Sequence, residues 1–237
     1  MLLVFPVWVY VSFFLAQQIV IGAVWLTVSI KIPLVSYNQA VLNTLFAVII
    51  YLITLTIVFG VPYIIKKRRP TAGDIGITRL PIWTDIFLTP AGLIVYFILS
   101  SALILLATSI LPWFDANQVQ DTGFRQLNGT GEYFLAFTAL IVIAPIAEEI
   151  LFRGYLYGKL KKYVPVWIAI IATSVLFGLI HGAWNLAIDT FALSIVLCLL
   201  RESTGSIWPS ILLHMAKNSI AFYFLFINPA LITALGG

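Results

Sequence analysis

Three long runs without a charged residue constrain the fold of this chain more than any other feature. They cover residues 2–30, 32–65 and 86–114. Each run exceeds the roughly 20 apolar residues with which an α-helix crosses the hydrocarbon core of a bilayer. Apolar residues make up 62% of the 237 and charged residues 9%, against about 25% charged in an average soluble domain. The sequence therefore predicts an all-α, polytopic membrane helix bundle.

Four further spans are expected after residue 114, where apolar and polar residues are mixed. They lie near residues 133–160, 164–182, 186–200 and 207–227, which gives about seven transmembrane helices. The first run lacks preceding basic residues and a small-residue cleavage site, so we interpret it as a retained helix. We expect residues 1–237 to form a single membrane domain. Its amino-terminal spans and loop would occupy 1–130, and its polar motifs 130–225.

Lysine and arginine residues are unevenly distributed between the predicted loops, and basic loops stay on the cytoplasmic side of a membrane. In the seven-span arrangement, one side holds Lys66, Lys67, Arg68, Arg69, Arg79, Lys159, Lys161, Lys162 and Arg201. The opposite loops hold only Lys31 and Arg125, the latter close to Asp115, Asp121 and Glu132. The amino terminus is therefore predicted to be cytoplasmic. The net charge of +4 is explained by orientation, and we expect no nucleic-acid partner.

The longest predicted cytoplasmic connection runs from residue 66 to residue 89. Pro70, Gly73, Gly76 and Pro81 interrupt any regular helix there. Two interpretations remain open from the sequence, namely a solvated linker and a segment that rests on the membrane surface.

A first cluster of polar residues, Glu148, Glu149 and Arg153, lies within the predicted span 133–160. Ionisable groups inside a membrane are costly and usually face a bundle interior or a water-filled cavity. Arg153 follows Glu149 by four residues, so the two share a helix face and can form an ion pair. Glu148 is rotated by about 100° around the helix and has no evident local partner. Glu148 therefore requires a functional explanation.

Two further clusters contain both histidines of the chain. Phe177 and His181 are one helical turn apart in the fifth predicted span, and His214 and Asn218 are one turn apart in the seventh. Alone, each histidine would be interpreted as a core residue with satisfied hydrogen bonds. Their joint occurrence in apolar spans indicates a polar site.

The three clusters can lie at similar depths in the membrane. If the turn near Tyr163 joins two antiparallel helices, Glu148 and His181 lie about 22 and 27 Å from it along their helices. His214 and Asn218 lie about 14 to 20 Å from the loop that precedes the last predicted span. We therefore expect these four residues to share one membrane-embedded cavity.

The three clusters, taken in order, resemble the motifs of a known family. The strings are Glu-Glu-x-x-x-Arg at 148–153, Phe-x-x-x-His at 177–181 and His-x-x-x-Asn at 214–218. They are similar to those of the CPBP family, the CAAX protease and bacteriocin-processing (Abi) proteins, whose relatives include the Ras-converting prenyl endopeptidase. The resemblance covers about residues 130–225. Three motifs in order, all in membrane-spanning context, are far more specific than any one of them.

The resemblance implies an intramembrane endopeptidase, in what we expect to be a bacterial plasma membrane. Its substrate would be a membrane-associated peptide or protein, either prenylated or of the bacteriocin type. In this interpretation Glu148 and His181 activate water, while His214 and Asn218 stabilise the oxyanion; these roles agree with general acid–base and oxyanion chemistry. Supporting roles fall to Glu149, Arg153 and Phe177.

This mechanism requires no metal, although a divalent metal remains an alternative. Glu148, His181 and His214 are acceptable zinc ligands as a set. The His-Glu-x-x-His string of many zinc proteases is absent. The local signatures of serine hydrolases, Gly-x-Ser-x-Gly and Ser-x-x-Lys, are absent as well.

A non-proteolytic membrane protein is the alternative from another functional class. Intramembrane Glu, His, Lys and Asn side chains would also suit a transporter, an immunity protein or a scaffold. No inverted repeat supports a transporter. Two residues near the motifs stay undecided, because Lys217 either extends away from the cavity or changes its charge, and Asp189 lies either near the interface or in the cavity.

Overall fold

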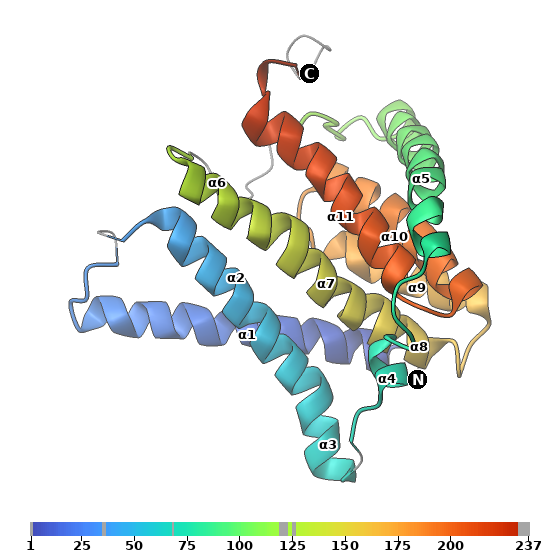
Figure 1. Ribbon diagram of the computed structural model, residues 1–237, viewed down its shortest axis with the longest axis horizontal. Coiled ribbons are helices and arrows are strands. Elements are labelled where there is room, and N and C mark those ends of the chain that lie inside the picture. The colour runs from blue at the N-terminus through green and yellow to red at the C-terminus, as the bar shows by residue number, and fades with distance from the viewer. Residues whose placement is uncertain (1, 35–36, 68, 119–122, 125–126, 232–237) are drawn as a thin grey trace.

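The computed structural model describes residues 2–34, 37–67, 69–118, 123–124 and 127–231, and the regular elements within them are helices. Arg68, Asp121 and Arg125, which entered the orientation argument, lie outside the described residues. The helices form a bundle in which the long helix of residues 130–160 lies beside the last helix of the chain (Figure 1).

The amino-terminal part contains two long antiparallel helices and a third that follows a short helical turn. In chain order they are α1 (Val4–Ser29), α2 (Gln39–Leu55), the π-helical segment η2 (Thr56–Gly60), α3 (Val61–Lys66), α4 (Ala72–Ile75) and α5 (Trp83–Ile110). The segments α2, η2 and α3 follow one another without interruption as one helix. Asn38 begins this helix, because its side chain accepts a hydrogen bond from the backbone N–H of Val41.

The carboxy-terminal part contains four helices that carry the sequence motifs. The first is continuous from Thr130 to Leu160. It comprises α6 (Thr130–Phe137), η3 (Thr138–Ile143), α7 (Ala144–Glu149), η4 (Ile150–Leu156) and α8 (Tyr157–Leu160). The other three helices are α9 (Val166–Leu179), α10 (Trp184–Thr204) and α11 (Trp208–Phe222), which ends in the π-helical segment η5 (Tyr223–Ile227).

Each of the seven expected spans is helical in the structure. Among the described residues, five helices are long and apolar enough to cross a membrane, namely Val4–Ser29, Gln39–Lys66, Trp83–Ile110, Thr130–Leu160 and Trp208–Ile227. Helix α9 has only 14 residues, and α10 carries Asp189, Arg201 and Glu202 within its 21 residues. The predicted all-α polytopic bundle is confirmed, while the orientation of the amino terminus stays a prediction.

The core of the bundle lies where η4, α9 and α10 meet. Fully buried large side chains from these elements include Leu151, Leu156, Phe177, Leu193 and Leu197. Helix α10 also packs against α5 and α11. The motif-bearing helices therefore form the most buried part of the molecule, and α1 and α2 cover it from outside.

The connection between α3 and α5 packs against the bundle through a contact of two glycines. A Cβ atom on Gly154, in η4, would lie 2.1 Å from the carbonyl oxygen of Ile75 in α4. A Cβ on Gly76, whose φ is +85°, would lie 2.9 Å from the Cα of Gly154. Only glycines permit this approach of two backbones. The segment is therefore packed on η4 at this point, whereas residues 71–73 beside it are exposed, and the choice between a solvated linker and a membrane-surface segment stays open.

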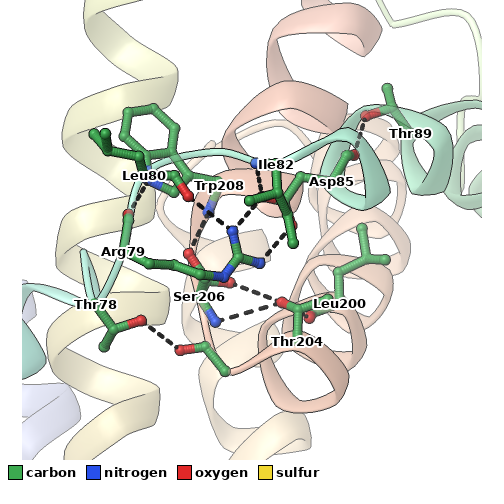
Figure 2. A network of polar contacts seen from close by, with 11 residues as sticks. Thr78, Arg79, Leu80, Ile82, Asp85, Thr89, Leu200, Thr204, Ser206 and Trp208 are labelled. Carbon is green, nitrogen blue, oxygen red and sulfur yellow. Dashed lines mark hydrogen bonds and ion pairs between the residues drawn. The ribbon is translucent and has the colours of Figure 1, made fainter.

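A network of polar contacts fixes the second half of the same connection (Figure 2). Arg79 makes two hydrogen bonds to the buried carboxylate of Asp85, at 2.6 and 2.7 Å. The indole N–H of Trp208 donates to the carbonyl oxygen of Arg79 at 2.7 Å, and the hydroxyl of Thr78 donates to the carbonyl oxygen of Gly205 at 3.1 Å. The connection is thus held to the loop between α10 and α11.

Ion pairs join the predicted cytoplasmic loops at one end of the bundle. Lys159 contacts Asp74 at 2.7 Å, and Lys161 contacts Glu202 at 2.6 Å. Burial raises the pKa of Asp74, but hydrogen bonds from Lys159 and Thr71 outweigh burial and hold that pKa below its usual range. The loops that the basic residues assign to one side of the membrane therefore contact one another in the structure.

Candidate active site

Glu148, in α7, has partners on two other helices. Its Oε1 atom accepts a short hydrogen bond from the hydroxyl of Tyr51 in α2, and its Oε2 atom lies 3.8 Å from Nε2 of His214 in α11. The sequence indicated correctly that Glu148 has no partner on its own helix. It gave no sign of Tyr51, which lies in an apolar run 97 residues away.

Glu149 lies deeper than Glu148 and forms the expected ion pair. Its Oε1 atom is 2.8 Å from Nη1 of Arg153, and both side chains are 0% exposed. The same oxygen is 2.9 Å from Nδ1 of His214. Glu148 retains 12% of its side-chain surface. Of the two glutamates, Glu148 is therefore the one that a water molecule or a substrate can reach, while Glu149 orients His214 from behind.

His181 lies just after the end of α9. Its Nδ1 atom is 2.6 Å from the carbonyl oxygen of Phe177, so Nδ1 carries the proton that it donates, and Nε2 is directed elsewhere. Glu148, Lys217 and His214 are its charged or titratable neighbours. The hydrogen bond fixes both the tautomer and the ring orientation of His181.

The ring of Phe177 contacts both histidines. It is fully buried, and its centroid lies 4.9 Å from that of His181 and 5.9 Å from that of His214, both edge to face. The guanidinium carbon of Arg153 lies 4.4 Å from the same centroid, a distance typical of a cation–π contact. Phe177 therefore positions the polar residues of all three motifs by packing.

Asn218 is held by the π-helical segment η3. Its Nδ2 atom donates a hydrogen bond of 2.9 Å to the carbonyl oxygen of Leu140. In a π-helix this carbonyl would accept from the residue five positions later, but that residue is Pro145, which has no N–H. Proline thus leaves an acceptor that fixes Asn218. A carboxamide has two N–H donors, so the second one is still available.

Lys217 and Asp189, whose roles the sequence left undecided, form an ion pair of 3.2 Å between α11 and α10. Asp189 also accepts hydrogen bonds of 2.6 Å from the hydroxyls of Tyr96 and Ser100 in α5. The charge of Lys217 is therefore balanced close to the site, and neither residue faces lipid alone.

The structure brings the candidate residues into one region, though not with equal closeness. Glu148 and His214 approach to 3.8 Å. The ring of Phe177 contacts both His181 and His214, and Asn218 follows His214 by one helical turn. The pairing differs in detail from the expected one, because it is Nε2 of His214 that lies 3.8 Å from Oε2 of Glu148. Their catalytic roles stay predictions.

A zinc site does not fit the described residues well. Among them, no group of three His, Cys, Asp or Glu side chains is arranged to hold a metal ion. Oε1 of Glu148 and Nδ1 of each histidine are bonded to other groups. Oε2 of Glu148 and Nε2 of each histidine remain, but in the described arrangement they do not form such a group, and no catalytic step is assigned to a metal.

The region that carries the three motifs matches a known protein family. Residues 130–220 match the type II CAAX prenyl endopeptidase Rce1-like family. The resemblance inferred from the three motifs is thereby confirmed for this region. The matched region covers α6 to most of α11 and contains all seven candidate residues, whereas Tyr51 lies outside it.

Two curated proteins to which the chain is similar are bacterial. One is YdiL of Bacillus subtilis (strain 168), named provisionally as a membrane peptidase, with 30% identity over 33% of this chain and 32% of its own length. The other is the UPF0177 protein YxdF of Lactococcus lactis subsp. lactis (strain IL1403), with 25% identity over 53% of this chain and 70% of its own length. The match to YdiL thus spans about a third of that protein. No solved structure is significantly similar to the chain.

Proposed function

We propose that this protein is an intramembrane endopeptidase in which Glu148 activates the water that attacks the peptide carbonyl. One observation carries the proposal, namely the division of partners between two adjacent glutamates. Glu149 is fully buried against Arg153 and His214. Glu148 retains exposed surface and directs one oxygen toward His214 at 3.8 Å. A structural role accounts for Glu149 but not for Glu148.

The attacking water would lie between Glu148 and His214. A separation of 3.8 Å between Oε2 and Nε2 is too long for a direct hydrogen bond but can be bridged by one water molecule. Tyr51 holds the other oxygen of Glu148, which orients Oε2. Glu148 would take a proton from this water as the new C–O bond forms, and would return it to the leaving amine when the C–N bond breaks.

Negative charge on the attacked carbonyl would be stabilised by donors that are already positioned. One N–H of Asn218 donates to the carbonyl oxygen of Leu140, which fixes the carboxamide, and the second N–H is available. Preorganised donors of this kind stabilise an oxyanion. His214 would assist from the same helix. His181, with Nε2 free of the bond that holds Nδ1, would share the proton of Glu148.

The substrate on this proposal is a peptide bond in a membrane-associated peptide or protein. The matched family is named for prenyl endopeptidases, and this supports a prenylated substrate as the first to test. Glu148, His214 and Asn218 lie on helices that are long and apolar enough to span a bilayer, which agrees with a substrate that is delivered from the membrane.

The test compares two glutamine variants. Glu148→Gln keeps the shape but removes the basic oxygen, so cleavage of a quenched peptide should fall by about 100-fold or more, with thermal unfolding in detergent unchanged. Glu149→Gln breaks a buried ion pair, which costs about 3 to 5 kcal/mol in soluble proteins, so it should mainly lower the unfolding temperature. Prenylated and plain peptides are both assayed.

Glu202→Gln is the matched control, because Glu202 pairs with Lys161 near the surface with 35% of its side chain exposed. Its activity should equal that of the wild type. If Glu148→Gln stays folded and cleaves as fast as the wild type, the hydrolytic mechanism fails. A non-proteolytic scaffold, immunity protein or transporter then becomes the better interpretation.

A further inference from the structure

A cavity lies at the end of the bundle where the basic loops meet, apart from the candidate active site. It has a volume of about 720 Å³ and is lined by the first turns of α1, by η2 and α3, and by the end of the helix that contains η4 and α8. This volume is in the range of small-molecule sites. Most of its lining is apolar or aromatic, and includes Phe5, Trp8, Val58, Phe59, Tyr155 and Tyr163.

Aromatic contacts and a proline shape this cavity. Phe5 stacks on Tyr163 at 5.7 Å between ring centroids, and Phe59 packs edge to face on Tyr155 at 5.4 Å. Pro62 follows η2 and lacks the N–H that an α-helix would direct to the carbonyl of residue 58. A π-helical segment and a proline are the features at which helices commonly bend, and residues of η2 and Pro62 line the cavity beside α1.

The rim of the cavity carries a positive charge that the protein balances only in part. Lys66, Arg69 and Lys159 line it together with one acidic residue, Asp74. Lys159 is paired with Asp74 at 2.7 Å. Lys66 and Arg69 form no ion pair with any residue in the part of the chain that the structure describes. Two cationic groups are therefore available beside an apolar space.

The cationic and apolar parts are arranged along the helix axis. Lys66 ends α3, while Val58 lies eight residues earlier in η2, or about 12 Å deeper at 1.5 Å per residue. Tyr155 and Tyr163 also line the cavity. Tyrosine is enriched at membrane–water interfaces, where an apolar ring and a polar hydroxyl are both accommodated. The cavity thus has a charged mouth and an apolar interior.

We propose that this cavity is a binding site for an anionic phospholipid of the leaflet at this end of the bundle. The phosphate would contact Lys66 and Arg69, and one acyl chain would lie along α1 and η2. Basic pockets between transmembrane helices on the cytoplasmic side bind anionic lipid headgroups by this complementarity. A free phosphate ion would leave the apolar interior empty, and a zwitterionic lipid would not match the net positive charge.

The experiment measures lipid retention by native mass spectrometry of the purified full-length protein, released from detergent with phosphatidylglycerol or phosphatidylcholine of equal chain length. The wild type should bind phosphatidylglycerol roughly tenfold or more tightly than phosphatidylcholine, the ratio expected for two basic side chains near one anionic headgroup. The double variant Lys66→Gln with Arg69→Gln should reduce this preference to less than threefold. Lys162→Gln, in the neighbouring loop but outside the cavity lining, should keep it.

A second variant separates the acyl-chain part of the site from the headgroup part. Val7 lines the cavity and is 55% exposed, so Val7→Trp fills apolar space without disturbing the core. It should lower phosphatidylglycerol binding about tenfold while the unfolding temperature stays unchanged. Glycerophosphoglycerol, the headgroup without acyl chains, should not compete with the lipid.

Three results would overturn the proposal. The first is an unchanged lipid preference in the Lys66, Arg69 double variant, and the second is equal binding of both lipids by the wild type. The third is full competition by the free headgroup, which would indicate a site for a soluble anion. Peptidase activity enters none of these measurements, so the lipid site and the catalytic proposal are tested separately.

Discussion

Tyr51 lies outside the three motifs and contacts the candidate general base directly. Its hydroxyl donates to Oε1 of Glu148, and this leaves Oε2 on the side of His214. A hydrogen bond to a charged group contributes about 1.5 to 3 kcal/mol. Tyr51 is therefore a positioning residue in the proposed mechanism, and it comes from the amino-terminal helices, outside the matched region 130–220.

Tyr51→Phe tests this role. Removal of the hydroxyl should lower kcat for peptide cleavage by about 10- to 100-fold, the rate equivalent of that hydrogen bond, while KM changes little. Tyr63→Phe is the control, because Tyr63 lies on the same helix with 41% of its surface exposed. Equal kcat values for Tyr51→Phe and the wild type would show that Glu148 does not depend on Tyr51.

At the scale of elements, the packing of α4 on η4 depends on Gly154. Gly154→Ala would place a methyl group 2.1 Å from the carbonyl oxygen of Ile75, so α4 must move away. We expect a loss of about 1 to 3 kcal/mol, as for other overpacked sites, seen as a lower unfolding temperature in detergent. The first motif lies immediately before this contact, so activity should fall as well.

Gly158→Ala is the matched control on the same helix. Its added Cβ would meet no atom closer than 3.9 Å, and alanine favours a helix over glycine by about 0.8 to 1.0 kcal/mol. Its unfolding temperature should therefore equal or exceed that of the wild type. A Gly154→Ala variant as stable as Gly158→Ala would argue against the close packing of α4.

The ion pair between Lys217 and Asp189 joins α11 to α10 next to the site. Removal of one partner leaves a charge in the bundle, whereas removal of both does not. Lys217→Met and Asp189→Asn should each lower the unfolding temperature, and the double variant should be more stable than the sum of the two losses predicts. Additive losses in this double-mutant cycle would show that the two charges do not interact.

At the scale of the whole molecule, the contacts between loops support a common side for the basic residues. Lys159 meets Asp74, and Lys161 meets Glu202, so three separate connections lie at one end of the bundle (Figure 1). The predicted cytoplasmic assignment of that end follows from its Lys and Arg content. It also fixes the leaflet from which the proposed phospholipid would come.

Reporter fusions test this orientation. A reporter fused after Arg69 should be active in the cytoplasm, and one fused after Asp115 should be active on the opposite side, because the helix Trp83–Ile110 separates the two points. Both reporters on one side would contradict the seven-span arrangement. Opposite sides in reversed order would keep the bundle and invert its orientation.

The sequence by itself determined the helices and the candidate residues. Long apolar runs must form helices in a bilayer, since each backbone N–H and C=O needs an internal partner there. The pairing of Glu149 with Arg153 followed from helical spacing alone. The three motifs indicated the resemblance that the family match over residues 130–220 confirms, because their residue types and order are specific. All of this information is local.

Only the tertiary structure decided how these residues meet. That Tyr51 bonds Glu148, that Glu149 holds His214 and that Asp189 neutralises Lys217 all depend on contacts between helices far apart in the chain. The packing of the connection after α3 on Gly154 is of the same kind. An apolar run inserts as a helix whatever its rotation about its own axis. Hydropathy therefore cannot specify which face of the helix meets which neighbour. Side-chain packing and polar pairing inside the bundle select that face.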